Sequence, residues 1–182
     1  IMSITVQTIK SDLKTQDFDL FETLVDLLQR SQTKLETGDV LVISSKYVAN
    51  SQGRLIEYDK VIPSQESRTL AAKFRLNPKI AEIILRESDV VFGGVPGFVI
   101  TSSDNILAPN AGIDKSNAQK GKLILYPVDS YQIAEQLKRK FLLEFSVHIG
   151  ILIIDSRLMP ARVGTVGVAI ACAGIEPLSD IR

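Results

Sequence analysis

The chain has 182 residues, of which 45% are hydrophobic and 23% are charged, so it has the composition of a globular protein with room for a substantial core. Lysine plus arginine and aspartate plus glutamate each total 21, and the resulting net charge of zero leaves no electrostatic footprint for nucleic acid or an anionic membrane surface. One cysteine, Cys172, excludes an internal disulfide and a cysteine-based zinc site.

The N-terminus lacks the basic, apolar and small-residue order of a signal peptide, and the longest apolar run, around residues 149–154, is too short to span a bilayer. We therefore expect a cytoplasmic protein. His148 is the only histidine, and because an apolar run follows it we expect a packed or capping side chain rather than a ligand.

The first quarter of the chain predicts strands and a helix. Residues 4–9 alternate well enough for a short strand, and Asp19 followed three residues later by Glu22 resembles a capping box that opens a helix. Residues 40–43 form a β-branched apolar run with the length of a buried strand, and residues 55–58 predict another short strand.

Ser44, Ser45 and Lys46 come directly after the strand predicted at residues 40–43. Hydroxyls, backbone N–H groups and an ammonium delivered into a helical turn lie at a sheet edge where phosphates commonly bind. Neither a Walker loop nor a Rossmann glycine motif occurs in the chain. From the residues alone, a phosphate site and a solvated lysine beside an N-capping serine are equally good interpretations.

Two packing helices are expected next, one starting at Pro63-Ser64 and one at Asn77-Pro78. Residues 90–92 and 98–101 predict a hairpin in which the intervening glycines serve turn geometry. Further strands are expected at residues 122–126, 149–154 and 168–173, and a helix capped by Ser130.

Polar groups and glycine concentrate between Ile106 and Asn117. Gly112 lets the backbone approach a ligand closely, while Asp114 and Asn117 offer a carboxylate and an amide. A hard cation or a phosphate would suit this set. The alternative is a tight turn in which these side chains bond their own backbone.

Asp155 follows the apolar strand predicted at residues 149–154. An acid at the carboxyl end of a buried strand lies at the sheet edge where ligands bind. Downstream, Arg162 in a glycine-spaced loop has a guanidinium suited either to clamp a phosphate or to pair with an acid.

Asp114 and Asp155 offer two carboxylates, and Lys46 and Arg162 are available for phosphate oxygens. This set of side chains suits Mg²⁺ or Mn²⁺, which prefers a few carboxylates plus substrate phosphate oxygens. The set permits a nucleotide-dependent transferase or ligase. It equally permits a metal-free fold with two buried structural acids.

Four segments taken in order resemble the coenzyme F420:L-glutamate ligase family, and they cover nearly the whole chain: GDVLVISSKYVANSQGR, APNAGIDKSN, ILIIDSR and ARVGTVGVAIACAGIEPLSD. The resemblance implies one domain over residues 1–182 with an α+β fold, in which mixed β-sheets are flanked by helices. It also implies a homodimer.

The resemblance further implies a GTP-dependent ligase that joins L-glutamate to F420-0 through an acyl phosphate and then adds a γ-linked glutamate. Mg²⁺ or Mn²⁺ would be the cofactor, with K⁺ as a further cation, because a transferred phosphoryl group needs its charge neutralised. The implied partners are F420-0, L-glutamate and GTP.

Carried over by position, the resemblance assigns roles to eight residues. The implied metal ligands are Asp114, Asp155 and Ser156, the last standing where the family usually has threonine. The implied nucleotide contacts are Ser45, Lys46, Asn50 and Asn117, and Arg162 is an implied phosphate contact.

The chain also departs from the family pattern. Asn50 stands where a second lysine is usual, Leu158-Met159-Pro160 replaces a Gly-Arg-x-Pro motif, and the C-terminal part of the pattern is expected to be absent. These departures favour an alternative, a catalytically degenerate relative that binds a nucleotide or small molecule. A third hypothesis is a plain structural domain in which the two aspartates lie far apart.

Overall fold

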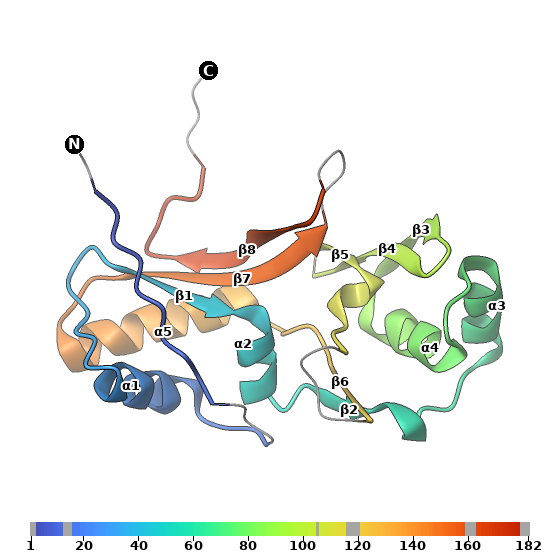
Figure 1. Cartoon of the computed structure of the whole chain (residues 1–182), viewed down its shortest axis with the longest axis horizontal. Helices are drawn as coiled ribbons and strands as arrows, with labels where there is room; N and C mark the ends of the chain where they lie inside the picture. Colours follow the sequence, from blue (N-terminus) through green and yellow to red (C-terminus); the bar gives the residue numbers. More distant parts are fainter. Residues whose placement is uncertain (1–2, 13–15, 105, 116–120, 159–162, 179–182) are drawn as a thin grey trace.

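The computed structural model of the chain describes residues 3–12, 16–104, 106–115, 121–158 and 163–178. Figure 1 shows two lobes side by side with a small connecting region between them. Each lobe contains a three-stranded sheet, of order β1-β7-β8 in the first lobe and β3-β4-β5 in the second, and the pair β2-β6 lies between the lobes. Parallel and antiparallel pairs both occur, so the expected α+β fold with mixed sheets flanked by helices is confirmed.

The first lobe packs two helices on one face of its sheet. Its elements are α1 (Leu20–Arg30), β1 (Val40–Ser44), α5 (Ser130–Phe145), β7 (Gly150–Leu158) and β8 (Thr165–Ala173). Helix α1 begins where the capping pattern predicted it, because the Asp19 side chain accepts a hydrogen bond from the Glu22 backbone N–H at 2.9 Å. Phe21 of α1 and Phe141 of α5 meet edge to face with ring centroids 5.0 Å apart, over a core that includes Ile153 of β7.

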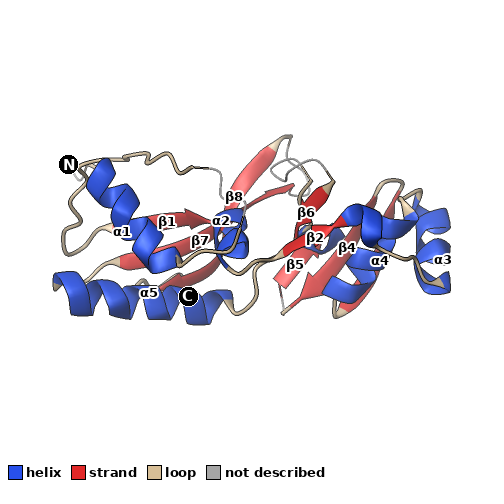
Figure 2. Ribbon diagram, turned by 90° about the horizontal axis from the view of Figure 1, so that it is seen from below, coloured by secondary structure: helices blue, strands red, loops and turns tan. Residues whose placement is uncertain are grey.

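The other face of the first sheet is open. The strand at β1 is confirmed, but the prediction that it is buried holds only in part, because Val40 and Val42 are 47% and 49% exposed while Ile43, the residue after them, is buried. Successive residues of a strand point to opposite faces, and both helices cover the same face. Figure 2, seen from below, shows the helices of both lobes in front of their sheets.

β1 and β7 run parallel, and β7 and β8 run antiparallel. The parallel ladder ends at the pair Ser44 and Ile154, but β7 continues to Leu158 by pairing with β8. Asp155 therefore lies inside a strand, and the expectation that β7 ends before it is wrong. Asp155 is nevertheless the first residue after the last β1-β7 parallel pair, so it lies at the carboxyl end of the parallel strands, as predicted.

Residues 4–9 do not form the predicted strand. They run as irregular chain in which Ile4 and Val6 are 91% and 81% exposed. The alternating pattern has no strand partner in the described part of the chain, and only Ile9 packs against the core of the first lobe. A short alternating pattern needs a neighbouring strand edge to become a strand, which local sequence does not reveal.

The second lobe consists of α3 (Gln65–Phe74), α4 (Pro78–Glu87), β3 (Val90–Val95), β4 (Phe98–Ser103) and β5 (Ile106–Pro109). Ser64 and Asn77 cap the two helices, as the sequence predicted. The β3-β4 hairpin is also confirmed, although β3 continues through Gly93-Gly94 and the turn shrinks to Pro96-Gly97. β5 was not predicted, because the polar character of the segment that begins at Ile106 indicated a turn.

The connecting region contains α2 (Ser45–Ser51), β2 (Leu55–Glu57), η1 (Tyr58–Lys60), η2 (Asn110–Gly112) and β6 (Lys122–Ile124). Arg54 pairs with Glu87 of α4, and its Nε donates to the Tyr126 carbonyl oxygen at 3.0 Å, so it fastens this region to the second lobe. None of the helices in the described ranges has the length and apolar character needed to cross a membrane.

Candidate functional site

Ser45 and Asp155 meet at the end of the parallel strands. Ser45 is fully buried and its Oγ donates to Asp155 Oδ1 at 2.8 Å. The same carboxylate oxygen lies 3.3 Å from Lys46 Nζ, and the Asp155 side chain is 8% exposed. The contact follows from the fold, because Ser44 pairs with Ile154 and the next residue of each strand therefore lies at the same edge.

Lys46 also reaches the segment that carries Asp114. Its Nζ donates to the Gly112 carbonyl oxygen at 2.9 Å and lies 5.6 Å from the centroid of the Tyr126 ring. The Lys46 side chain is only 17% exposed, so its positive charge is stabilised mainly by the Asp155 carboxylate, the Gly112 carbonyl and the Tyr126 ring rather than by solvent. The lysine thus joins the first lobe to the η2 segment.

Gly112 allows that segment to approach Tyr126. Its φ of +67° lies in the left-handed region, and a Cβ placed on it would lie 2.1 Å from Tyr126 Cδ2. No side chain fits in that space, so the glycine is required both by backbone conformation and by close packing. The sequence predicted that Gly112 lets the backbone approach a ligand; the group that it approaches in this structure is the protein's own Tyr126 ring.

Arg157 completes the cluster. Its Nη2 donates to Tyr126 Oη at 2.6 Å, an Nη1 hydrogen bond goes to the Leu107 carbonyl oxygen, and its Nε lies 3.9 Å from Asp155 Oδ2. Burial raises the pKa of Tyr126 to about 12, partly offset by the positive charge of Arg157. Tyr126 therefore stays protonated at neutral pH.

The cluster carries more positive than negative charge. Lys46 and Arg157 each bring one positive charge against the single negative charge of Asp155. Both cations are largely buried, with side-chain exposures of 17% and 10%, so solvent screens the excess only partly. An anionic ligand such as a phosphate would be attracted to this place.

Asp114 lies close to the cluster through its backbone. It forms an antiparallel bridge with Ile124, with both N–H···O distances at 2.9 Å. Two residues earlier, Gly112 accepts the Lys46 hydrogen bond, and two peptide steps span at most about 7 Å. The structure therefore brings the segments of Asp114 and Asp155 together.

Ser156 is placed differently from Asp155. Neighbouring residues of a strand point to opposite faces, and here Asp155 is buried while Ser156 is exposed. The structure does not bring the hydroxyl of Ser156 to the side of the sheet where the Asp155 carboxylate lies.

Asn50 is buried on α2, one turn after Lys46, and its Oδ1 has no hydrogen-bond partner within the described ranges. Residues four apart lie on the same helix face, so the amide and the ammonium share that face. The two other predicted contacts, Asn117 and Arg162, lie outside the described residues.

A cleft of about 260 Å³ also borders Tyr126. Its lining includes four carboxylates and one guanidinium, contributed by Glu87, Asp89, Asp104, Asp129 and Arg54. Since Arg54 is already paired with Glu87, the cleft is strongly acidic and unsuited to phosphate or carboxylate groups. The Lys46 and Arg157 cluster is the better place for an anion.

The Asp155 carboxylate is a ligand of the type that a hard divalent cation prefers. The described residues contain no group of three or more His, Cys, Asp or Glu side chains that could hold a metal ion, so these residues would supply an ion here with at most two carboxylate ligands. Mg²⁺ commonly binds in this way, with substrate phosphate oxygens and water completing its coordination. Asp155 and Asp114 are the residues that would hold it.

Comparison with known proteins identifies the family. A family model described as F420-0:Gamma-glutamyl ligase matches residues 8–182, nearly the whole chain. The chain belongs to this family. The resemblance drawn from the sequence motifs is therefore confirmed.

Curated relatives in this family carry the name coenzyme F420:L-glutamate ligase. The protein of Methanopyrus kandleri is 38% identical over 160 residues, which cover 87% of this chain and 63% of the relative. Those of Methanocaldococcus jannaschii and Archaeoglobus fulgidus are 34% and 31% identical, each over 82% of this chain and 60% of the relative. The chain thus spans about three fifths of the length of these family members.

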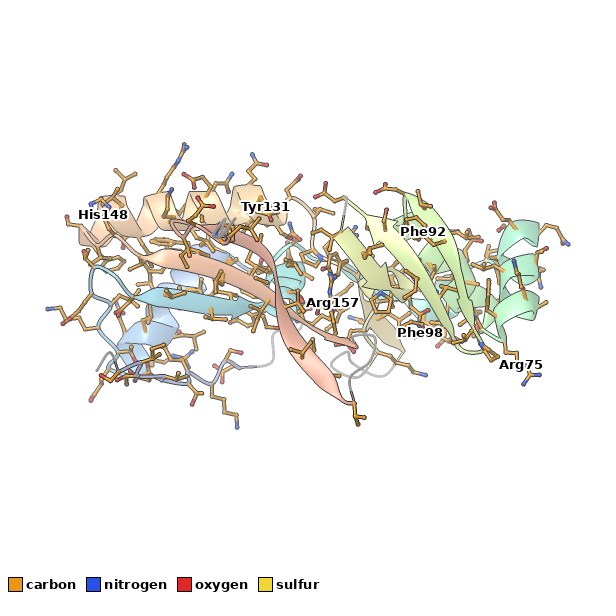
Figure 3. The ribbon with its side chains drawn as sticks, turned by 90° about the horizontal axis from the view of Figure 1, so that it is seen from above. Arg75, Phe92, Phe98, Tyr131, His148 and Arg157 are labelled. Carbon is orange, nitrogen blue, oxygen red and sulfur yellow. The ribbon has the colours of Figure 1, made fainter. Side chains whose placement is uncertain are left out.

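Sequence reasoning missed Arg157 and Tyr126. A signal for Arg157 was present, because it lies two residues after Asp155 and residues two apart in a strand share a face. Tyr126 gave no such signal, since its role depends on how the lobes meet. His148, expected to be packed or capping, is instead exposed, and Figure 3 places it at the far end of the first lobe from Arg157.

Proposed function

We propose that this chain forms the metal- and nucleotide-holding part of a ligase that adds L-glutamate to F420-0 with GTP. The observation that carries the proposal is the buried Asp155 carboxylate at the end of the parallel strands, held by Ser45, Lys46 and Arg157. Membership of the family and the names of its relatives support the choice of reaction.

Each residue has a role that its surroundings favour. Lys46 and Arg157 provide positive charge for nucleotide phosphates, and Asp155 with Asp114 would hold Mg²⁺ or Mn²⁺. The divalent cation would neutralise charge on the transferred phosphoryl group. The protein groups would orient the γ-phosphate of GTP in line with the carboxylate of F420-0, which attacks it and displaces GDP. The glutamate amine would then attack the acyl phosphate, displacing inorganic phosphate and losing a proton as the amide forms.

Asn50 is proposed as a direct nucleotide contact, and the fully buried Ser45 as a residue that supports the nucleotide site indirectly. An unpaired buried acceptor costs about 1–3 kcal/mol, so the Asn50 Oδ1 gains from any donor that a nucleotide or a water molecule brings. Ser45 acts through Asp155, to which its hydroxyl donates. Asn117, Arg162 and K⁺ remain in the proposal on the family pattern alone. Ser156 is left out, because its hydroxyl is not on the side of the sheet where the Asp155 carboxylate lies.

A second candidate function is nucleotide binding without glutamate transfer. Asn50 favours it, because a neutral amide replaces a positive charge where the family usually has lysine. Under this alternative the chain binds Mn²⁺ and GTP, but no radiolabelled glutamate enters F420-0 in their presence. Incorporation of glutamate by the chain would exclude it.

Self-association into a homodimer is part of the proposal. The open faces of both sheets carry exposed apolar side chains, which include Val40 and Val42 in the first lobe and Phe92, Ile100 and Leu107 in the second. Exposed apolar side chains that gather into a patch are typical of interfaces. A two-fold pair would cover the same surface on both copies.

Asp155→Asn is expected to remove the Mn²⁺-dependent part of GTP binding, since the amide keeps the shape of the side chain but loses the charge that holds the cation. Isothermal titration calorimetry of the chain with GTP, with and without Mn²⁺, measures this. The matched control is Asp26→Asn, an exposed acid of α1 paired with Arg30. Equal Mn²⁺-dependent affinities for Asp155→Asn and the unchanged chain would reject the proposed site.

A further inference from the structure

We propose that Arg157 is a positioning residue, which holds the Asp155 carboxylate in place and fastens the two lobes together at the site. The inference deepens the proposed function, and its binding measurement rests on that function. Neither the family pattern seen in the sequence nor the names of the relatives assign a role to this arginine. It immediately precedes Leu158-Met159-Pro160, where the chain departs from the family pattern.

Arg157 contacts three separate parts of the fold. Its own strand is β7 of the first lobe, the Leu107 carbonyl belongs to β5 of the second lobe, and Tyr126 follows β6 of the connecting region. Figure 3 shows Arg157 between the two sheets. The side chain is 10% exposed, so these contacts are made in the interior of the junction.

The geometry requires an arginine. The two Nη atoms of the planar guanidinium donate in different directions, to a phenol oxygen and to a carbonyl oxygen, while Nε stays near Asp155. A lysine has one nitrogen on a flexible stem and cannot satisfy both acceptors from a fixed plane. Lysine at this position would keep the charge but lose the bridge.

A positioning role for Arg157 and a purely electrostatic role predict opposite changes in cation affinity when the arginine is removed. At 3.9 Å the Nε is in ion-pair range of Oδ2 but beyond hydrogen-bond distance. If Arg157 acted only through its charge, removing it would make Asp155 more attractive to a cation. If it acts by holding Asp155 and the lobes in place, removing it lowers cation affinity even though a repulsive charge has gone.

The test uses Arg157→Met, which keeps the apolar stem, and Arg157→Lys, which keeps the charge. We expect both variants to bind Mn²⁺ about tenfold more weakly than the unchanged chain, as measured from the free Mn²⁺ signal in electron paramagnetic resonance. Tyr126→Phe is expected to reproduce part of the loss and to be non-additive with Arg157→Met, because the two residues act as one unit. Arg139→Met, at an exposed ion pair on α5, is the matched control.

Amide hydrogen exchange of the same proteins measures the local stability of the junction between the lobes, and it needs no ligand. We expect exchange in residues 106–112 and 123–126 to be about tenfold faster in Arg157→Met, while the amides of α1 keep their rates and exclude global unfolding. Where the unchanged chain binds Mn²⁺, equal or tighter binding by Arg157→Met overturns the inference. Where the unchanged chain binds no Mn²⁺, the proposed function fails, and unchanged exchange at the junction overturns this inference separately.

Discussion

Gly112→Ala is expected to destabilise the folded chain by about 3 kcal/mol or more. A left-handed backbone costs an alanine about 1–2 kcal/mol, and forcing an extra carbon into a packed site costs about 1–3 kcal/mol. Both costs apply here, because φ is +67° and the new Cβ would lie 2.1 Å from the Tyr126 ring. Tyr126 and the Gly112 carbonyl both contact Lys46, so the strain would reach the centre of the site.

Urea unfolding measures the free energy of unfolding of Gly112→Ala and of a comparison variant, Gly97→Ala. The difference between them separates the backbone cost from the packing cost. Gly97 has a φ of +83°, but a Cβ added to it would have no neighbouring atom within 4 Å, so only the backbone cost of about 1–2 kcal/mol applies to it. Equal losses of unfolding free energy in the two variants would show that Gly112 does not pack against Tyr126 as described.

Lys46→Met is expected to cost about 3 kcal/mol of folding stability. Removing one partner of a buried ion pair leaves the other charge without compensation, and Asp155 is 8% exposed. Breaking a buried ion pair in this way typically costs about 3–5 kcal/mol. We expect the lower end of this range, because Ser45 and Arg157 would still contact the carboxylate. The same substitution removes a proposed phosphate contact.

A double-mutant cycle identifies the cause of that loss. If the cost arises from an unpaired Asp155, then Lys46→Met should be much less destabilising in an Asp155→Asn background, where no buried charge remains at that position. Lys60→Met, at an exposed pair with Glu57, is the matched control and should change the unfolding free energy by at most about 0.5 kcal/mol. Additive losses at Lys46 and Asp155 would contradict the described ion pair.

Local features of the fold were predictable from the sequence. The caps at Asp19, Ser64 and Asn77 involve residues two or three apart, so the pattern that predicts each cap also contains its partner. The same reasoning placed Ser45 and Lys46 at the start of a helical turn after a strand. The approach of Asp155 to Lys46 followed from a general rule, that ligand groups gather beyond the carboxyl ends of parallel strands.

Features that depend on distant neighbours were not predictable. The run at residues 40–43 has the composition of a buried strand, yet Val40 and Val42 are exposed because both helices pack on one side. Residues 4–9 alternate like a strand but have no strand partner in the described ranges. The bridge from Arg157 to Tyr126 and Leu107 exists only once the lobes have met, so no local pattern contains it.

Paramagnetic broadening by Mn²⁺ tests the central claim most directly, because the chain offers a cation two competing places. In the ¹⁵N-labelled chain with GTP and substoichiometric Mn²⁺, the proposed site predicts that amide signals of residues 44–46, 112–114 and 155–157 are lost first. The amide signals around the acidic cleft lined by Asp89, Asp104 and Asp129 should weaken less, and only at higher Mn²⁺ concentrations. Broadening centred on that cleft, with the signals around Asp155 intact, would contradict the proposed metal and nucleotide site.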